Sequence, residues 1–220
     1  MIQDVVHVYF MPGMAASSQI FEYINLPEST FKSHYLEWIM PVTNESLNEY
    51  AFRMSKKIKH QNCVLIGVSF GGVLVQEISK HISVRKLIIV SSVKSNKELP
   101  KKMILAKVTK AYKLLPVQLA SNIELFAKYA FGNNIPKRIE LYKKYMLFSN
   151  SLYLSWAIEK MVCWEQEEII PNIIHIHGDK DTVFPIKNIK EGIIISNGTH
   201  IMILNKFKWF NENLPKLILS

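Results

Sequence analysis

The chain has 220 residues, of which 49% are hydrophobic and 20% are charged. These values are ordinary for a globular protein, so we expect one domain with a full core and exclude a disordered, low-complexity or repeat protein. The formal net charge is +9, and the whole excess falls between Lys94 and Lys144, where twelve Lys and Arg residues accompany three Glu.

Three features of the sequence bear on where the protein resides. The N-terminus lacks a basic region followed by a long apolar stretch, which argues against a signal peptide. No run approaches the ~18 apolar residues of a membrane-spanning helix. Cys63 and Cys163 lie in apolar surroundings without metal-ligand spacing, as is typical of reduced core cysteines. We therefore expect a cytoplasmic protein.

The first half of the chain alternates strand and helix patterns. The expected strands cover residues 5–10, 33–39, 63–68 and 86–93, and the expected helices cover 17–23, about 43–59 and 70–81. Strands with near-continuous apolar runs between helices indicate a mostly parallel, doubly wound α/β sheet that is covered on both faces. In such sheets the functional site lies at the carboxyl ends of the strands.

The alternation stops after residue 93. Residues 94–168 show no strand pattern and contain four expected short helices, at 101–114, 117–130, 136–148 and 150–163. Strand patterns return at 172–177 and 192–196, and a final amphipathic helix is expected at 201–218 with a kink near Pro215. We therefore divide the chain into a core of about six strands, residues 1–93 and 169–220, and an all-helical insertion, residues 94–168.

A Gly-x-Ser-x-Gly sequence lies between the expected strand 63–68 and the expected helix 70–81, with Ser69 at its centre. A serine at the tip of a sharp strand-to-helix turn has a strained backbone, and side chains two residues before and after it would collide. Gly67 and Gly71 leave that space open, and the helix directs its amide dipoles at the serine oxygen. This context favours a nucleophile elbow over a glycine-rich turn with an incidental serine.

An acid and a base follow in the order that such an elbow requires. A serine hydroxyl is a weak nucleophile at neutral pH and needs a histidine that is oriented by a carboxylate. Asp179 and Asp181 follow the expected strand 172–177, and His200 follows the expected strand 192–196. All of them should therefore lie on the same rim of the sheet as Ser69.

These residues resemble the α/β-hydrolase superfamily, and the resemblance covers nearly the whole chain apart from the insertion. The matching segments are Gly67-Val68-Ser69-Phe70-Gly71, His177-Gly178-Asp179-Lys180-Asp181 and Gly198-Thr199-His200. The resemblance implies that Ser69 is the nucleophile, His200 the base and Asp181 the acid. Asp179 is the competing acid, and its expected role is to bond loop amides.

The resemblance also implies further parts of a site. An oxyanion hole would be built from the backbone N–H groups of Met14 and Phe70, and residues 94–168 would form a helical cap. The sequence departs from the superfamily's pattern at Pro12-Gly13, where His-Gly is common, and this weakens the match at Met14. The interval between acid and base is short, and two antiparallel strands usual at the N-terminus are absent, so we expect a compact version.

The predicted activity is hydrolysis of a carboxylic ester or thioester that carries a small or medium apolar acyl group. Acyl transfer, carbon–carbon bond hydrolysis by the same triad, and a non-catalytic ligand-binding role are the alternatives. The positive charge of the insertion would suit an anionic substrate or an anionic membrane as a partner. The favoured explanation of this charge is a solvated lysine face. No nucleic-acid module is recognisable, and the oligomeric state is not indicated.

No cofactor or metal is expected, because the chain has neither a dinucleotide-binding nor a Walker-type glycine loop, and no Cys, His or Asp cluster has ligand spacing. The other histidines are interpreted as structural: His7, His34, His60, His81, His175 and His177. Several apolar residues of the insertion could line a pocket, among them Leu105, Tyr145, Phe148, Tyr153 and Trp156. For each one, packing between cap and core is the favoured role.

Overall fold

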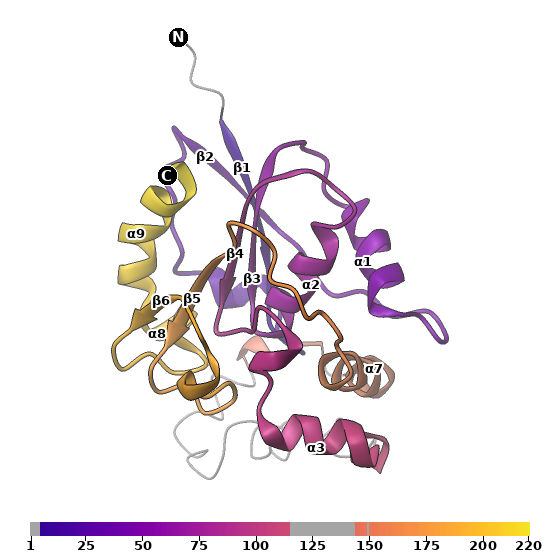
Figure 1. Ribbon diagram of the computed structural model, residues 1–220. Helices are drawn as coiled ribbons and strands as arrows, with labels where there is room; N and C mark the ends of the chain where they lie inside the picture. The colour runs from indigo at the N-terminus through magenta and orange to yellow at the C-terminus, as the bar shows by residue number, and fades with distance from the viewer. Residues whose placement is uncertain (1–4, 115–143, 149) are drawn as a thin grey trace.

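The computed structural model describes residues 5–114, 144–148 and 150–220 (Figure 1). Its centre is a six-stranded sheet in which every neighbouring pair of strands is parallel, in the order β2-β1-β3-β4-β5-β6. This confirms the predicted doubly wound α/β architecture. The strands are β1 (Val6–Met11), β2 (Phe31–Tyr35), β3 (Cys63–Val68), β4 (Val84–Val90), β5 (Ile174–Gly178) and β6 (Ile193–Ile195).

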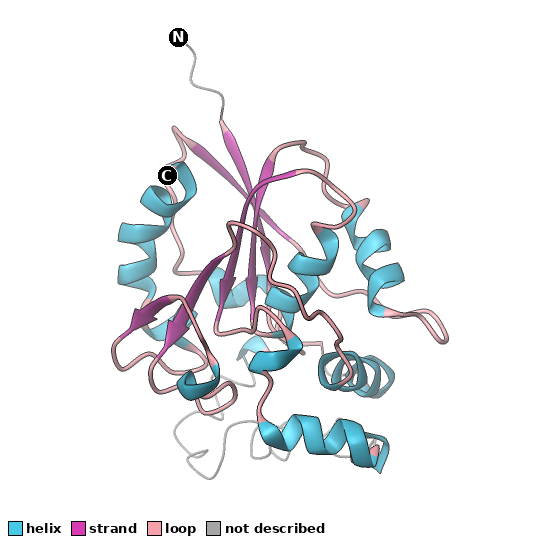
Figure 2. Cartoon of the chain, in the orientation of Figure 1, coloured by secondary structure: helices cyan, strands magenta, loops and turns pink. Residues whose placement is uncertain are grey.

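Helices cover both faces of the sheet (Figure 2). One face packs against α1 (Leu47–Ser55), α2 (Phe70–Ile78) and part of α7 (Ser151–Val162). The other face packs against the 3-10 helix η1 (Ser18–Phe21), α8 (Met202–Asn205) and α9 (Phe207–Leu219). Alternate residues of a strand point to opposite faces, so Leu65 of β3 joins the first core and Ile66 the second. This double burial explains the near-continuous apolar runs of the strands.

The sheet sets the position of the site through its strand order. The chain winds outward from β1 in both directions, with β2 on one side and β3 on the other. Such a reversal opens a crevice at the carboxyl ends of the central strands, where loops from both halves meet. The loops after β1, β3, β5 and β6 therefore gather at one rim of the sheet.

Several element boundaries differ from the prediction for local reasons. Helix α1 begins after Ser46 rather than near residue 43, because Ser46 and Glu49 form a reciprocal capping box. The expected helix 101–114 is interrupted at Lys110, whose φ of 56° is left-handed, and becomes α3 (Lys101–Thr109) and the 3-10 helix η3 (Ala111–Leu114). The expected helix 17–23 is only the 3-10 turn η1.

The C-terminal segment also differs from the prediction. Two helices, α8 and α9, replace the single expected helix, and the break lies at Lys206 rather than near Pro215. Lys206 has φ −114° and ψ 21°, and this turn lets Phe210, Leu214 and Ile218 of α9 pack on the sheet. Pro215 lies inside α9.

The predicted all-helical insertion is described only in part. Helix α7 matches the expected helix 150–163 and is capped by Asn150, whose side chain accepts hydrogen bonds from the N–H groups of Leu152 and Tyr153. The expected helix 117–130 lies outside the described residues, as does most of the expected helix 136–148. Within the described ranges, no helix is both long and apolar enough to cross a bilayer.

Candidate active site

Ser69 occupies the sharp turn between β3 and α2. Its backbone has φ 53° and ψ −122°, a left-handed conformation that is strained for any residue with a side chain. The turn has no room for larger neighbours: a Cβ at Gly67 would lie 2.3 Å from the Gly71 carbonyl oxygen, and a Cβ at Gly71 would lie 2.2 Å from the Pro12 carbonyl oxygen. Gly71 thus lets the elbow press against the loop after β1.

The structure brings Ser69, His200 and Asp181 into one hydrogen-bonded chain. Nε2 of His200 is 2.9 Å from Oγ of Ser69, and Nδ1 of His200 is 2.9 Å from Oδ2 of Asp181. The other carboxylate oxygen, Oδ1, accepts hydrogen bonds from the N–H groups of Val183 and Phe184, at 2.8 and 3.0 Å. Each carboxylate oxygen is therefore held, so Asp181 can orient the imidazole.

Of the two candidate acids, Asp181 is the one that contacts the imidazole. Asp179 lies two residues earlier, where its backbone N–H donates to the Ile195 carbonyl. The expectation that the Asp179 side chain bonds loop amides is wrong for one of its oxygens, because its buried Oδ1 has no hydrogen-bond partner among the described residues.

Burial and charge act against each other at Asp181. The residue is only 5% exposed, and burial by itself raises the pKa of the carboxyl. The electrostatic interaction with His200 and the hydrogen bonds from His200 and Phe184 outweigh burial, so the pKa of Asp181 lies below its ordinary value. The carboxylate is therefore ionised at neutral pH and can stabilise a positive charge on the imidazole.

Two further histidines lie behind the acid on β5. Nε2–H of His177 donates to the Phe184 carbonyl at 2.8 Å and so holds this carbonyl in place. Nδ1 of His177 is 3.1 Å from Nε2 of His175. Burial lowers the pKa of both rings, that of His175 to about 3. Both rings are therefore neutral at neutral pH and support the Asp181 loop by hydrogen bonding. This is the structural role expected for both from the sequence.

The loop after β1 places Gly13 beside the elbow, where an added Cβ at Gly13 would lie 3.4 Å from Cβ of Ser69. The Gly13 carbonyl accepts hydrogen bonds from Nε1 of Trp38 at 2.9 Å and from the N–H of Ala16 at 3.0 Å. Across a trans peptide the C=O and the next N–H point in opposite directions, so the Met14 N–H points away from Trp38. Among the described residues, no hydrogen bond occupies the N–H of Met14 or that of Phe70.

Trp38 is a residue of this site that the sequence analysis missed. Its indole bonds the loop that carries Met14, and the same ring stacks on Phe70, with centroids 5.3 Å apart and an interplanar angle of 10°. It therefore contacts both segments that supply the candidate oxyanion amides. The sequence holds only a weak signal for this role, because Trp38 is a single tryptophan just after a strand, at the rim where the site lies.

The comparisons with known proteins bear on the fold. No family model and no curated protein matches the chain. Solved structures match along almost its whole length. Epoxide hydrolases of the alpha/beta hydrolases superfamily from hot-environment metagenomes give a TM-score of 0.70 at 11% identity, covering 99% of this chain and 91% of theirs. A Nitrososphaera gargenis carboxylesterase gives 0.67 at 16%, covering 98% and 90%. The Bacillus anthracis bromoperoxidase gives 0.66 at 15%, covering 99% and 93%.

The chain has the α/β-hydrolase fold. At these identities the likeness establishes the fold.

In this α/β-hydrolase fold, α7 packs beside the elbow through aromatic side chains. Trp156 lies 4.4 Å from Tyr50 and 6.2 Å from Phe70 between ring centroids, and its Nε1 donates to the Glu45 carbonyl at 2.8 Å. Tyr153 is fully buried and lies 5.3 Å from Trp38. These two residues of the insertion thus contribute to packing, as the sequence analysis favoured.

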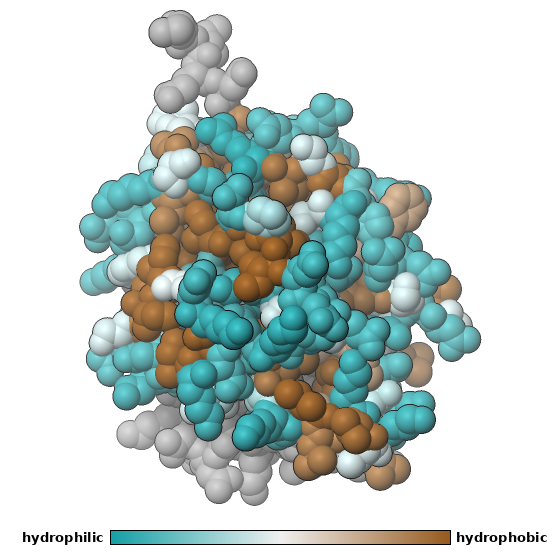
Figure 3. Space-filling model, viewed as in Figure 1, coloured by the Kyte–Doolittle hydropathy of each residue, from teal (hydrophilic) through white to brown (hydrophobic). Residues whose placement is uncertain are grey.

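Helix α3 has a different environment. Its apolar side chains are largely exposed, with Leu105 at 63% and Val108 at 75%. Brown, hydrophobic residues accordingly appear in Figure 3 where Figure 1 places α3. The expectation that Leu105 lines a pocket or packs on the core is therefore wrong for the described structure.

The excess charge of the insertion is partly compensated by carboxylates from outside residues 94–144. Lys97 pairs with Glu167 at 3.4 Å, and Lys107 with Glu165 at 3.1 Å. Lys144 pairs with Glu22 at 2.5 Å. Such exposed pairs contribute little stability, but they reduce the local positive field that an anionic partner would meet. This supports a solvated lysine face.

Proposed function

We propose that this chain is a serine hydrolase that cleaves a carboxylic ester or thioester through an acyl-enzyme. The observation that carries the proposal is the continuous hydrogen-bonded chain from Ser69 through His200 to Asp181, placed at the carboxyl ends of three strands. A serine in a strained turn, a histidine at 2.9 Å and an ionised, anchored carboxylate are the parts that nucleophilic acyl transfer needs.

The proposed reaction has two halves. Nε2 of His200 takes the proton as Oγ of Ser69 attacks the substrate carbonyl, and Asp181 stabilises the imidazolium. The N–H groups of Met14 and Phe70 hold the negative oxygen that forms, and His200 then protonates the leaving alcohol or thiol. In the second half, His200 takes a proton from water, the resulting hydroxide attacks the acyl-enzyme, and Ser69 regains its proton as the acid leaves.

An apolar acyl group suits the residues that surround these atoms. Met14 is a partly buried apolar residue of the loop after β1, and Phe70 packs its ring on Trp38 in the core beneath the elbow. Phe184, on the acid loop, places its ring edge to face with His200 at 5.6 Å. The proposed substrate is therefore a small molecule with a small or medium apolar acyl chain, and no cofactor takes part in the steps above.

The experiment that tests this proposal is hydrolysis of p-nitrophenyl esters of increasing acyl length, with acyl thioesters in parallel, by wild type and Ser69→Ala. We expect turnover by wild type with a preference for short or medium chains, and a loss of at least about 10³-fold in Ser69→Ala. Equal turnover by the two proteins would refute the proposal. Addition of an alcohol acceptor distinguishes hydrolysis from acyl transfer, since a transferase would release the acceptor's ester.

A further inference from the structure

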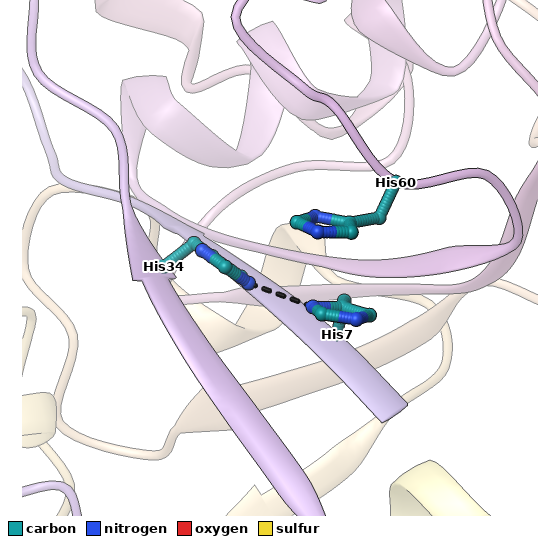
Figure 4. A group of neighbouring side chains, drawn as sticks. All are labelled: His7, His34 and His60. Atoms are coloured by element: carbon teal, nitrogen blue, oxygen red, sulfur yellow. Dashed lines mark hydrogen bonds between the residues drawn. The ribbon is translucent and has the colours of Figure 1, made fainter. Parts of the chain in front are cut away.

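Three histidines from three separate segments meet on the sheet face that packs against α1 and α2 (Figure 4). His7 lies on β1, His34 on β2, and His60 in the loop between α1 and β3. One ring nitrogen from each lies within 4.8 Å of the others, and all three side chains are half-buried. His7 is four residues before the end of β1, about 13 Å from the rim that carries Ser69, so this cluster is separate from the triad.

The three rings already contact one another through the groups that bind metals. Nδ1 of His7 and Nε2 of His34 are 2.8 Å apart, so one proton lies between two imidazole nitrogens. The ring of His60 stacks on that of His7, with centroids 3.5 Å apart and an interplanar angle of 5°. An imidazole binds a metal ion through a ring nitrogen that carries no proton, and each of these rings brings one nitrogen to the cluster.

Tyr9 contacts one nitrogen of the His60 imidazole. Oη of Tyr9 is 2.6 Å from Nδ1 of His60, and the N–H of Lys59 donates to the same oxygen at 3.1 Å. A phenol oxygen has two lone pairs, so it can accept from both Lys59 and an Nδ1–H of His60. In that tautomer Nε2 of His60 keeps its lone pair. Ligating histidines are commonly oriented in this way through their second nitrogen.

We propose that His7, His34 and His60 form a binding site for a divalent transition-metal ion of the Zn²⁺ type, with Tyr9 orienting His60. In a tetrahedral Zn²⁺ site with Zn–N distances of about 2.0–2.1 Å, the ligand nitrogens lie about 3.3 Å apart. That separation falls between the 2.8 Å of the His7–His34 contact and the 4.8 Å limit of the cluster. The ion takes the place of the shared proton, and the His60 ring turns out of its stack with His7.

Such an ion would have a structural consequence. Strand β2 is at the edge of the sheet, and the ion would tie it to β1 and to the loop before β3. Three imidazoles leave a fourth position for water or for an outside ligand. Metal motifs are recognised in a sequence by short spacing, whereas these ligands lie 27 and 26 residues apart, so the expectation of no metal site did not account for them.

The test is calorimetric titration of ZnCl₂ into the untagged, chelator-stripped chain. We expect about one Zn²⁺ per chain, a loss of affinity of at least about 100-fold in His34→Ala and in His60→Ala, and about 10-fold in Tyr9→Phe. His81→Ala removes a half-exposed histidine outside the cluster and should bind as wild type does. Thermal unfolding in chelator checks that each variant is folded, and His60→Ala, in a loop, carries the test if His34→Ala is unstable.

Two results would overturn the proposal: no binding by wild type up to about 100 µM Zn²⁺, or unchanged binding by the folded His34→Ala and His60→Ala variants. Ser69→Ala should bind Zn²⁺ as wild type does, so this result is independent of the proposed hydrolase activity. Where binding occurs, hydrogen exchange should show slower opening of β2 with Zn²⁺ than with chelator.

Discussion

The neutral histidines behind the acid make the folding stability depend on pH. His175 is 3% exposed on β5, and burial, with the nearby His177 and Lys94, lowers its pKa to about 3. In the unfolded chain a histidine titrates near 6.5. Between these two pKa values the unfolded state binds a proton that the folded state does not, so the free energy of unfolding falls as the pH falls through this window.

The size of the effect follows from the two pKa values. Between pH 7 and pH 5, protonation of an ordinary histidine stabilises the unfolded chain by about 2 kcal/mol, while a folded His175 with a pKa of about 3 gains almost nothing. Asp181 acts outside this window: its pKa is lowered, so its contribution is present above the ordinary carboxyl pKa and is lost only as the pH falls through the folded value.

The assay is urea unfolding at pH 7 and at pH 5 for wild type, His175→Gln and His81→Gln. Each protein is compared with itself, so a constant loss of stability in a variant cancels. We expect the decrease in unfolding free energy to be smaller by roughly 2 kcal/mol in His175→Gln than in wild type. His81→Gln is the control variant, which removes a half-exposed histidine outside the His175–His177 pair. An identical decrease in all three proteins would show that folded His175 takes up a proton, contrary to our reasoning.

Three further predictions concern the site. Asp181→Asn should lower kcat/KM by roughly 10³–10⁴-fold while the chain stays folded, because the amide cannot hold the productive imidazole tautomer; a loss below 10-fold in steady-state assays would contradict this. Gly71→Ala should cost roughly 1–3 kcal/mol in urea unfolding, and clearly more than Gly13→Ala, whose added Cβ meets nothing closer than 3.4 Å. Trp38→Phe should lower kcat about 10-fold with little change in KM, because the Met14 amide loses its anchor; Trp164→Phe, which removes another buried indole hydrogen bond, should leave kcat unchanged.

The sequence was sufficient for the parts of the molecule that depend on local pattern. The apolar run 63–68 predicts a buried strand, and the glycines on either side of Ser69 predict a tight turn directly after it. The order of Ser69, Asp181 and His200 is readable because each follows a strand, and parallel strands end at one rim. The choice of Asp181 over Asp179 came from the resemblance, and the structure now supplies a hydrogen bond for it.

The sequence was insufficient where contacts between distant segments decide. Trp38 becomes part of the candidate active site only because the loop after β1 folds onto it. His7, His34 and His60 come together only through strand register and a loop. The helix breaks at Lys110 and Lys206 depend on left-handed or irregular backbone conformations of residues that otherwise favour helix.

The most direct test of the central claim is labelling by a fluorophosphonate probe, read by intact mass and peptide mapping. We predict one adduct per chain, located on Ser69, with no adduct in Ser69→Ala and much slower labelling in Asp181→Asn. Such a probe reports the activated serine and needs no knowledge of the natural substrate. Failure of the folded wild type to react, or equal labelling of Ser69→Ala, would contradict the account.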